Sequence, residues 1–228
     1  MKIFRYIASG ARVFAAQPVF FLLGGLLCYL PLFASQFYLE EGKLKFWLDS
    51  LPLLYWQLIV SAGLSLAALK ALGGEKPDNR ELFSGFSRLG DLLGYLLILF
   101  AVNQLNGKGL EKYLNPKLPA HTLALAGLFV LYLVVFVGLM FTLYLMMEKK
   151  LSWWRAAGES LRLILPRWFA LFFLFVICIS PYLLLGVWLK HQGADLQSRS
   201  APLLAYGLQV LLQPLKICIV AAAYRDIA

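Results

Sequence analysis

Six long blocks of apolar residues run through this chain, separated by short polar segments. A block of about 20 apolar residues is long enough to cross the hydrocarbon core of a bilayer as a helix. The apolar residues do not alternate with polar ones, as they would in a membrane-spanning strand. The sequence therefore predicts six transmembrane helices, roughly at residues 18–39, 50–72, 92–107, 121–147, 168–189 and 201–222.

The composition agrees with a multi-pass membrane protein that forms one domain over residues 1–228. Hydrophobic residues make up 61% of the chain and charged residues 14%, whereas charged residues are about a quarter of an ordinary soluble domain. All three cysteines (Cys28, Cys178 and Cys218) fall inside apolar blocks. We therefore interpret them as small core residues rather than as a disulfide or metal set.

An amphipathic segment precedes the fifth block. Its polar residues follow at steps of three, four and three, so they share one helical face: Ser152, Arg155, Glu159 and Arg162. The opposite face is apolar and includes Trp154 and Leu161. A helix of this kind typically lies in the membrane interface, with its aromatic side toward the acyl chains. We call this a leading segment, because a transmembrane block follows it directly.

Similar segments occur earlier in the chain at a regular interval. Arg5, Arg80 and Arg155 are 75 residues apart, and Pro31 and Pro181 are 150 apart. The spacing predicts three repeats, approximately 1–75, 76–150 and 151–228, each with a cytoplasmic amphipathic helix and a hairpin of two transmembrane helices. The alternative is that unrelated helical hairpins of similar length look alike.

Lysine and arginine are distributed unevenly between the two sides of the predicted bundle. Fourteen belong to the N-terminus, the second and fourth loops and the C-terminal end, and seven belong to the other loops. The positive-inside rule then places both termini in the cytoplasm. The net charge of +9 forms a collar suited to anionic lipid headgroups rather than a nucleic-acid patch. The predicted headgroup contacts are Arg5, Arg12, Arg80, Arg155 and Arg162.

Polar residues inside two blocks are the main candidates for a functional site. Gln57, Ser61 and Ser65 form a stripe on the second block. Gln209, Gln213 and Lys216 share a face of the sixth, next to Pro214, which should kink that helix. One interpretation is a polar path for a substrate or ion. The other is simple helix packing, with Lys216 extending toward the cytoplasmic surface.

Neither a catalytic, a cofactor-binding nor a metal site is predicted. His121 and His191 have no cysteine or carboxylate nearby at ligand spacing. The apolar blocks carry no carboxylate near their middle. The sequence therefore favours a non-enzymatic protein without a cofactor.

Three short motifs carry a resemblance to a known family. They are residues 214–227 at the C-terminus, the Trp-x-Ala-x-x-x-Ser pattern of residues 154–160, and Phe83-Ser-Gly-Phe86. Together with the layout of the chain, they resemble bacterial six-span inner-membrane proteins of the YciC kind and the related membrane domains of some glycerophosphodiester phosphodiesterases. The resemblance implies location in a bacterial inner membrane and brings no catalytic residues.

Taken together, the sequence predicts an all-α membrane protein of six transmembrane helices in three hairpin repeats. The expected function is that of an accessory or scaffold protein that acts through anionic lipids or another membrane protein. The alternative is a small transporter or channel with a polar path between the repeats.

Overall fold

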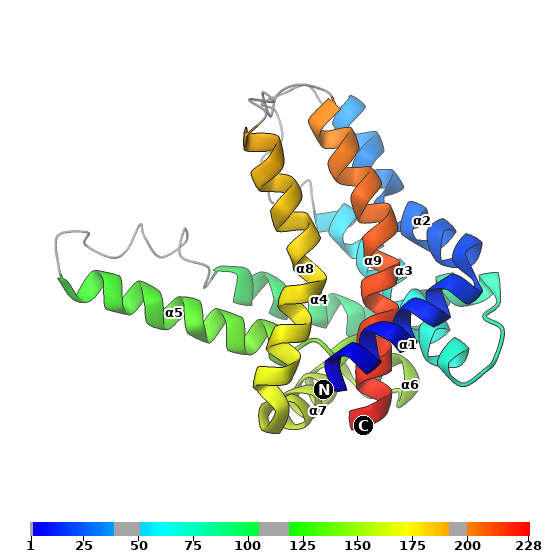
Figure 1. The fold of residues 1–228 in the computed structure, drawn as a ribbon. Coiled ribbons are helices and arrows are strands. Elements are labelled where there is room, and N and C mark those ends of the chain that lie inside the picture. Colours follow the sequence, from blue (N-terminus) through cyan, green and yellow to red (C-terminus); the bar gives the residue numbers. More distant parts are fainter. Residues whose placement is uncertain (1, 39–50, 105–118, 192–199) are drawn as a thin grey trace.

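The structure, a computed structural model, describes residues 2–38, 51–104, 119–191 and 200–228, and within these ranges the chain is helical without strands (Figure 1). Among the described residues, five helical stretches are long and apolar enough to cross a membrane, and the bent pair at the N-terminus makes a sixth if it is counted as one span. The helices are α1 (Lys2–Ala16), α2 (Pro18–Tyr38), α3 (Leu51–Leu72), η1 (Asn79–Arg88), α4 (Leu89–Gln104), α5 (Pro119–Gly138), α6 (Thr142–Glu148), α7 (Trp153–Ile164), η2 (Leu165–Arg167), α8 (Trp168–His191) and α9 (Ser200–Ile227).

Five of the six predicted spans correspond to single helices, namely α2, α3, α4, α8 and α9. The predicted ends of the first and third spans, residue 39 and residues 105–107, and the predicted start of the second, residue 50, lie outside the described residues. The fourth predicted span, residues 121–147, corresponds to a candidate span at Val130–Glu148 that is not one uninterrupted helix. A turn at residues 139–141 separates α5 from α6.

The interruption between α5 and α6 is held by a side chain from another segment. Ser160 of α7 donates a hydrogen bond to the carbonyl oxygen of Gly138 at 2.6 Å and accepts one from the amide of Phe141 at 3.1 Å. The hydroxyl of Tyr95 donates to the carbonyl oxygen of Leu139 at 3.3 Å. These side chains supply partners to backbone groups that have left the helical ladder, which is how helix breaks are tolerated in membranes.

All three leading segments are helical, and each packs against one of three helices that we call the inner helices. The inner helices are α3, the interrupted pair α5–α6, and α9. The segment α1 packs on α9, η1 packs on α3, and α7 packs on α6. The order is cyclic, since each leading segment contacts the inner helix that precedes it in the chain, and α1 contacts the last one.

Small residues make this close packing feasible. A Cβ atom at Gly10 would collide with the backbone of α9 at Ile219, and one at Gly85 would collide with the backbone of α3 at Ile59. The third leading segment has Ser160 at its contact with α5 and α6. Gly10, Gly85 and Ser160 are separated by 75 residues in each case. Small residues at helix interfaces let backbones approach and are the usual solution in membrane proteins.

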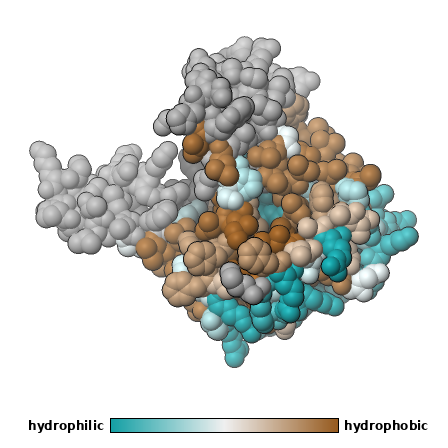
Figure 2. Space-filling view, in the orientation of Figure 1, coloured by the Kyte–Doolittle hydropathy of each residue, from teal (hydrophilic) through white to brown (hydrophobic). Residues whose placement is uncertain are grey.

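The remaining long helices, α2, α4 and α8, are called here the outer helices. Buried residues make up 56%, 50% and 44% of the most apolar windows of α3, α5–α6 and α9, but 28% and 22% of those that include α4 and α8. In Figure 2 most of the visible middle of the molecule is hydrophobic, while hydrophilic residues gather along its lower and right-hand edges. Both termini lie near the lower edge (Figure 1). Cys28, Cys178 and Cys218 are buried, as the sequence predicts, and are free thiols.

Candidate functional site: a polar cavity between the inner helices

A cavity of about 390 Å³ lies among the three inner helices, with α4 and α8 completing its wall. Its volume falls within the usual range for ligand pockets. Most of the lining is apolar, including Leu58, Leu99 and Phe175. The polar lining consists of Gln57, Ser61, Ser65, Tyr95, Tyr144, Gln213 and Lys216.

Five of the six residues that the sequence marks on the two polar stripes line this one cavity: Gln57, Ser61, Ser65, Gln213 and Lys216. The sixth, Gln209, is not part of its lining. Gln209 lies about one helical turn before Gln213 on α9, and its Oε1 atom is buried with no hydrogen-bond partner in the described part of the chain. The structure therefore joins the stripes of α3 and α9, which are about 150 residues apart in sequence.

Lys216 is the only lysine or arginine in the lining. It precedes the last residue of α9 by eleven positions, which corresponds to about 16 Å of helix. It lines the cavity with Ser61 and Ser65, so its charge belongs to the interior of the bundle and not to the charged collar in which the sequence interpretation counted it. Among the described residues, no carboxylate lies within 4 Å of its Nζ atom.

The polar groups of the cavity divide into two kinds. Three hydroxyls are satisfied by the backbone: Ser65 donates to Ser61, Tyr95 to Leu139 and Tyr144 to Ile217. The side-chain amides of Gln57 and Gln213 form no hydrogen bond with any other described residue. The first set shapes the wall, and the second set remains available to a ligand.

Sequence reasoning missed Tyr95, Tyr144 and Cys178 as lining residues. Tyr95 and Cys178 are on outer helices, α4 and α8, and Tyr144 is on α6. Cys178 has no charged or amide neighbour at helical spacing, and those of Tyr95 and Tyr144, Asp91 and Glu148, lie just outside the apolar blocks. No polar stripe within a block therefore marks these three residues. Only the packing of α4, α6 and α8 against α3 and α9 brings them to the cavity.

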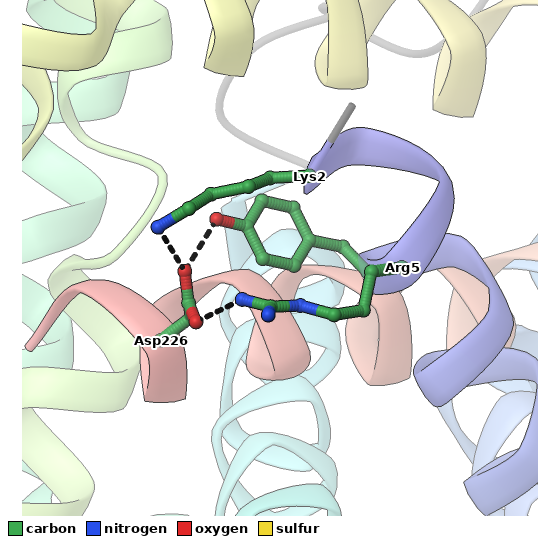
Figure 3. A network of polar contacts seen from close by, with 4 residues as sticks. Lys2, Arg5 and Asp226 are labelled. Carbon is green, nitrogen blue, oxygen red and sulfur yellow. Dashed lines mark hydrogen bonds and ion pairs between the residues drawn. The ribbon is translucent and has the colours of Figure 1, made fainter.

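The predicted headgroup residues are in different situations. Arg5 pairs with Asp226, which also accepts hydrogen bonds from Lys2 at 3.2 Å and from the hydroxyl of Tyr6 at 2.8 Å (Figure 3). The guanidinium of Arg155 lies 4.8 Å from the ring centre of Trp154. Arg12, Arg80 and Arg162 are exposed, and none forms a salt bridge with another described residue. Contact of these five arginines with lipid headgroups stays a prediction.

The burial pattern of α7 adds a third face to the two predicted from its sequence. Ala156, Ala157, Ser160 and Ile164 are buried against the protein. Trp154 is 55% exposed and Leu165 is 57% exposed. Trp154 and Leu165 of the predicted apolar face are therefore free to contact lipid, whereas Leu161 of the same face packs against Gly138 of α5.

Comparisons with protein-family models, curated proteins and solved structures found no match to this chain. The resemblance to six-span proteins of the YciC kind therefore stays a prediction. Within the described ranges, no three His, Cys, Asp or Glu side chains come together as a metal site.

The cavity combines one cation, two available amides and a mostly apolar wall. An unpaired cation in an apolar environment costs several kcal/mol, whereas an anion beside it offsets much of that cost. The apolar part of the wall gives no preference for an anion and instead accommodates a hydrocarbon chain. The combination suits a molecule with an acidic head and an apolar chain.

Proposed function

We propose that this chain is a non-enzymatic integral membrane protein that binds an amphipathic anion in the cavity between its inner helices. The ligand has a carboxylate or phosphate head at Lys216 and an apolar chain among Leu58, Leu99 and Phe175. The observation that carries the proposal is the position of Lys216 in this cavity with no salt bridge to a described carboxylate. Gln57 and Gln213 add hydrogen bonds to the head.

Of the two functions that the sequence leaves open, the cavity favours the transporter or lipid carrier. The three inner helices occupy equivalent positions in the three proposed repeats. A cavity between such helices is suited to opening alternately to the two sides of the membrane, as in transporters built from parallel repeats. A scaffold function is the second candidate. It is supported by the exposed apolar side of α8, where Phe169 is 76% and Phe173 56% exposed, since such a surface suits a membrane partner as well as lipid.

The proposal includes the three-hairpin repeat. It is supported by the cyclic packing of α1, η1 and α7 on α9, α3 and α6, and by the equal spacing of Gly10, Gly85 and Ser160. Pro31 of α2 and Pro181 of α8 each follow the first residue of their helix by thirteen positions. We further propose location in a bacterial inner membrane, as the resemblance to six-span proteins of the YciC kind implies. Both termini are placed in the cytoplasm on the basis of the lysine and arginine distribution.

The test is ligand binding by purified protein in a mild, uncharged detergent. The probe is a fluorescent long-chain fatty acid, and its matched uncharged control is the corresponding alcohol. Removing a charged hydrogen-bonding partner costs about 1.5–3 kcal/mol, so Lys216→Met should weaken fatty-acid binding by roughly 10- to 100-fold. Lys216→Arg retains the cation and should retain most of the affinity.

The alcohol should bind wild type and Lys216→Met equally, because it has no charge to lose. Equal fatty-acid affinity in wild type and Lys216→Met, with both variants folded, would contradict the proposal. If Lys216→Met has no effect on binding but abolishes co-purification of a membrane protein, the scaffold function is the better account.

A further inference from the structure

A second cavity, of about 350 Å³, lies at the end of the molecule that carries both chain termini. It is formed by α1, by η2 with the start of α8, and by the end of α9. Its apolar residues are Ile3, Ala170, Leu171 and Ile227, and its basic residues are Lys2 and Arg167. None of these is among the predicted headgroup contacts, and the cavity shares no lining residue with the one around Lys216.

The two basic residues differ in what they already bind. Lys2 pairs with Asp226 at 3.2 Å. Arg167 is exposed and forms no salt bridge with another described residue. It directly precedes Trp168, the first residue of α8. One lining residue therefore offers a free guanidinium at the point where a membrane helix begins.

The charge around this cavity is positive. Asp226 is the acidic side chain of the adjoining network, and it already accepts from Lys2, Arg5 and Tyr6 (Figure 3). Lys2, Arg5 and Arg167 bring three positive charges against that one carboxylate. An anion that enters the cavity therefore meets a guanidinium whose planar donors suit phosphate oxygens.

We propose that this second cavity holds a membrane phospholipid, with its phosphate between Arg167 and Lys2 and an acyl chain along Ala170 and Leu171. A soluble phosphate would use the charges but not the apolar residues Ile3 and Ile227. An uncharged lipid would use the apolar wall but not Arg167. Only a lipid with a phosphate head uses both, and an anionic headgroup uses them best.

The experiment is native mass spectrometry of the full chain in mild detergent with added phosphatidylglycerol or phosphatidylethanolamine. One basic residue at an anionic surface contributes about 1 kcal/mol, so Arg167→Gln should reduce phosphatidylglycerol retention about fivefold. The control is Lys76→Gln, which removes an exposed cation that is not among the predicted headgroup contacts and does not line the cavity, and it should retain wild-type binding. Ala170→Trp fills the apolar part and should reduce retention of both lipids.

Three outcomes would overturn the site. They are unchanged retention in Arg167→Gln, an equal loss in Lys76→Gln, or displacement of the lipid by excess inorganic phosphate, which would indicate a soluble anion instead. Arg167→Gln removes no salt bridge within the described protein, so its folding should be unaffected even if Ala170→Trp proves unstable. Lys216→Met should leave this binding unchanged, which separates the second cavity from the proposed function.

Discussion

The inner and outer helices are built from similarly apolar sequences, yet the protein uses them differently. Over half of the most apolar window of α3 is buried, whereas 22% of the window that includes α8 is buried. Gly63 of α3 lies so close to the backbone of η1 that a Cβ would collide with the carbonyl oxygens of Glu81 and Leu82. Phe169 and Phe173 of α8 are largely exposed.

This difference in burial shows that the overall apolarity of a helix does not reveal whether it packs inside a membrane protein or faces lipid. Lipid tails are as apolar as leucine, so a large hydrophobic side chain gains little by leaving lipid for protein. Small and weakly polar residues such as Gly63, Ser61 and Ser65 gain close backbone contact and hydrogen bonds. The inner helix α3 is therefore distinguished from α8 by small residues at its contacts, and the cavity forms where the packing of the inner helices leaves room.

The largest effect in the comparison of inner and outer helices is expected from the substitution of two phenylalanines. Phe141 is fully buried at the turn between α5 and α6, and Phe173 is 56% exposed on α8. Phe141→Ala should destabilise the protein by up to about 3–5 kcal/mol, because it leaves a cavity among well-packed neighbours. Phe173→Ala should change stability far less, since lipid fills the space. Unfolding in mixed detergent micelles measures both, and equal losses would remove the distinction between inner and outer helices.

Two glycines test the close packing of the leading segments. Gly85→Ala places a methyl group against the backbone of Ile59, while a Cβ at Gly158 of α7 meets nothing within 4 Å. Overpacking against backbone typically costs about 1–3 kcal/mol, whereas Gly158→Ala should stabilise its helix by up to about 1 kcal/mol. Thermal stability in detergent should therefore move in opposite directions for the two variants. A tolerated Gly85→Ala would show that η1 does not pack tightly on α3.

An effect no larger than that of Gly85→Ala is expected from the hydroxyl that holds the turn at residues 139–141. Ser160→Ala removes bonds to Gly138 and Phe141 and leaves their backbone groups without those partners, at a cost of about 1–3 kcal/mol. The control is Ser180→Ala on α8, where the hydroxyl bonds only to Ile177 one turn earlier in the same helix. Hydrogen exchange should rise at residues 139–142 in Ser160→Ala alone. An unchanged exchange rate there would contradict the assigned role.

The sequence predicts the fold well wherever the information is local. Block length predicts the helices, and helical spacing within α3 and α9 predicts the polar side chains of the cavity. The turn between α5 and α6 could not be predicted, because Ser160 in a different segment supplies its hydrogen bonds. Nor could the pairing of Arg5 with Asp226, which lie 221 positions apart. The regular spacing of Gly10, Gly85 and Ser160 was present in the sequence and would have indicated the packing of the leading segments.

The most direct measurement is photo-crosslinking with a long-chain fatty acid that carries a photoreactive group on its chain, followed by peptide mapping. Binding in the cavity predicts labels on residues such as Leu58, Leu99 and Phe175, with labelling lost in Lys216→Met and retained in Lys216→Arg. Exposed residues of α8 such as Phe169 and Phe173 should be labelled equally in all three proteins, because they face the surrounding detergent. Labels confined to these exposed residues, or cavity labels that persist in Lys216→Met, would contradict the anion-binding site.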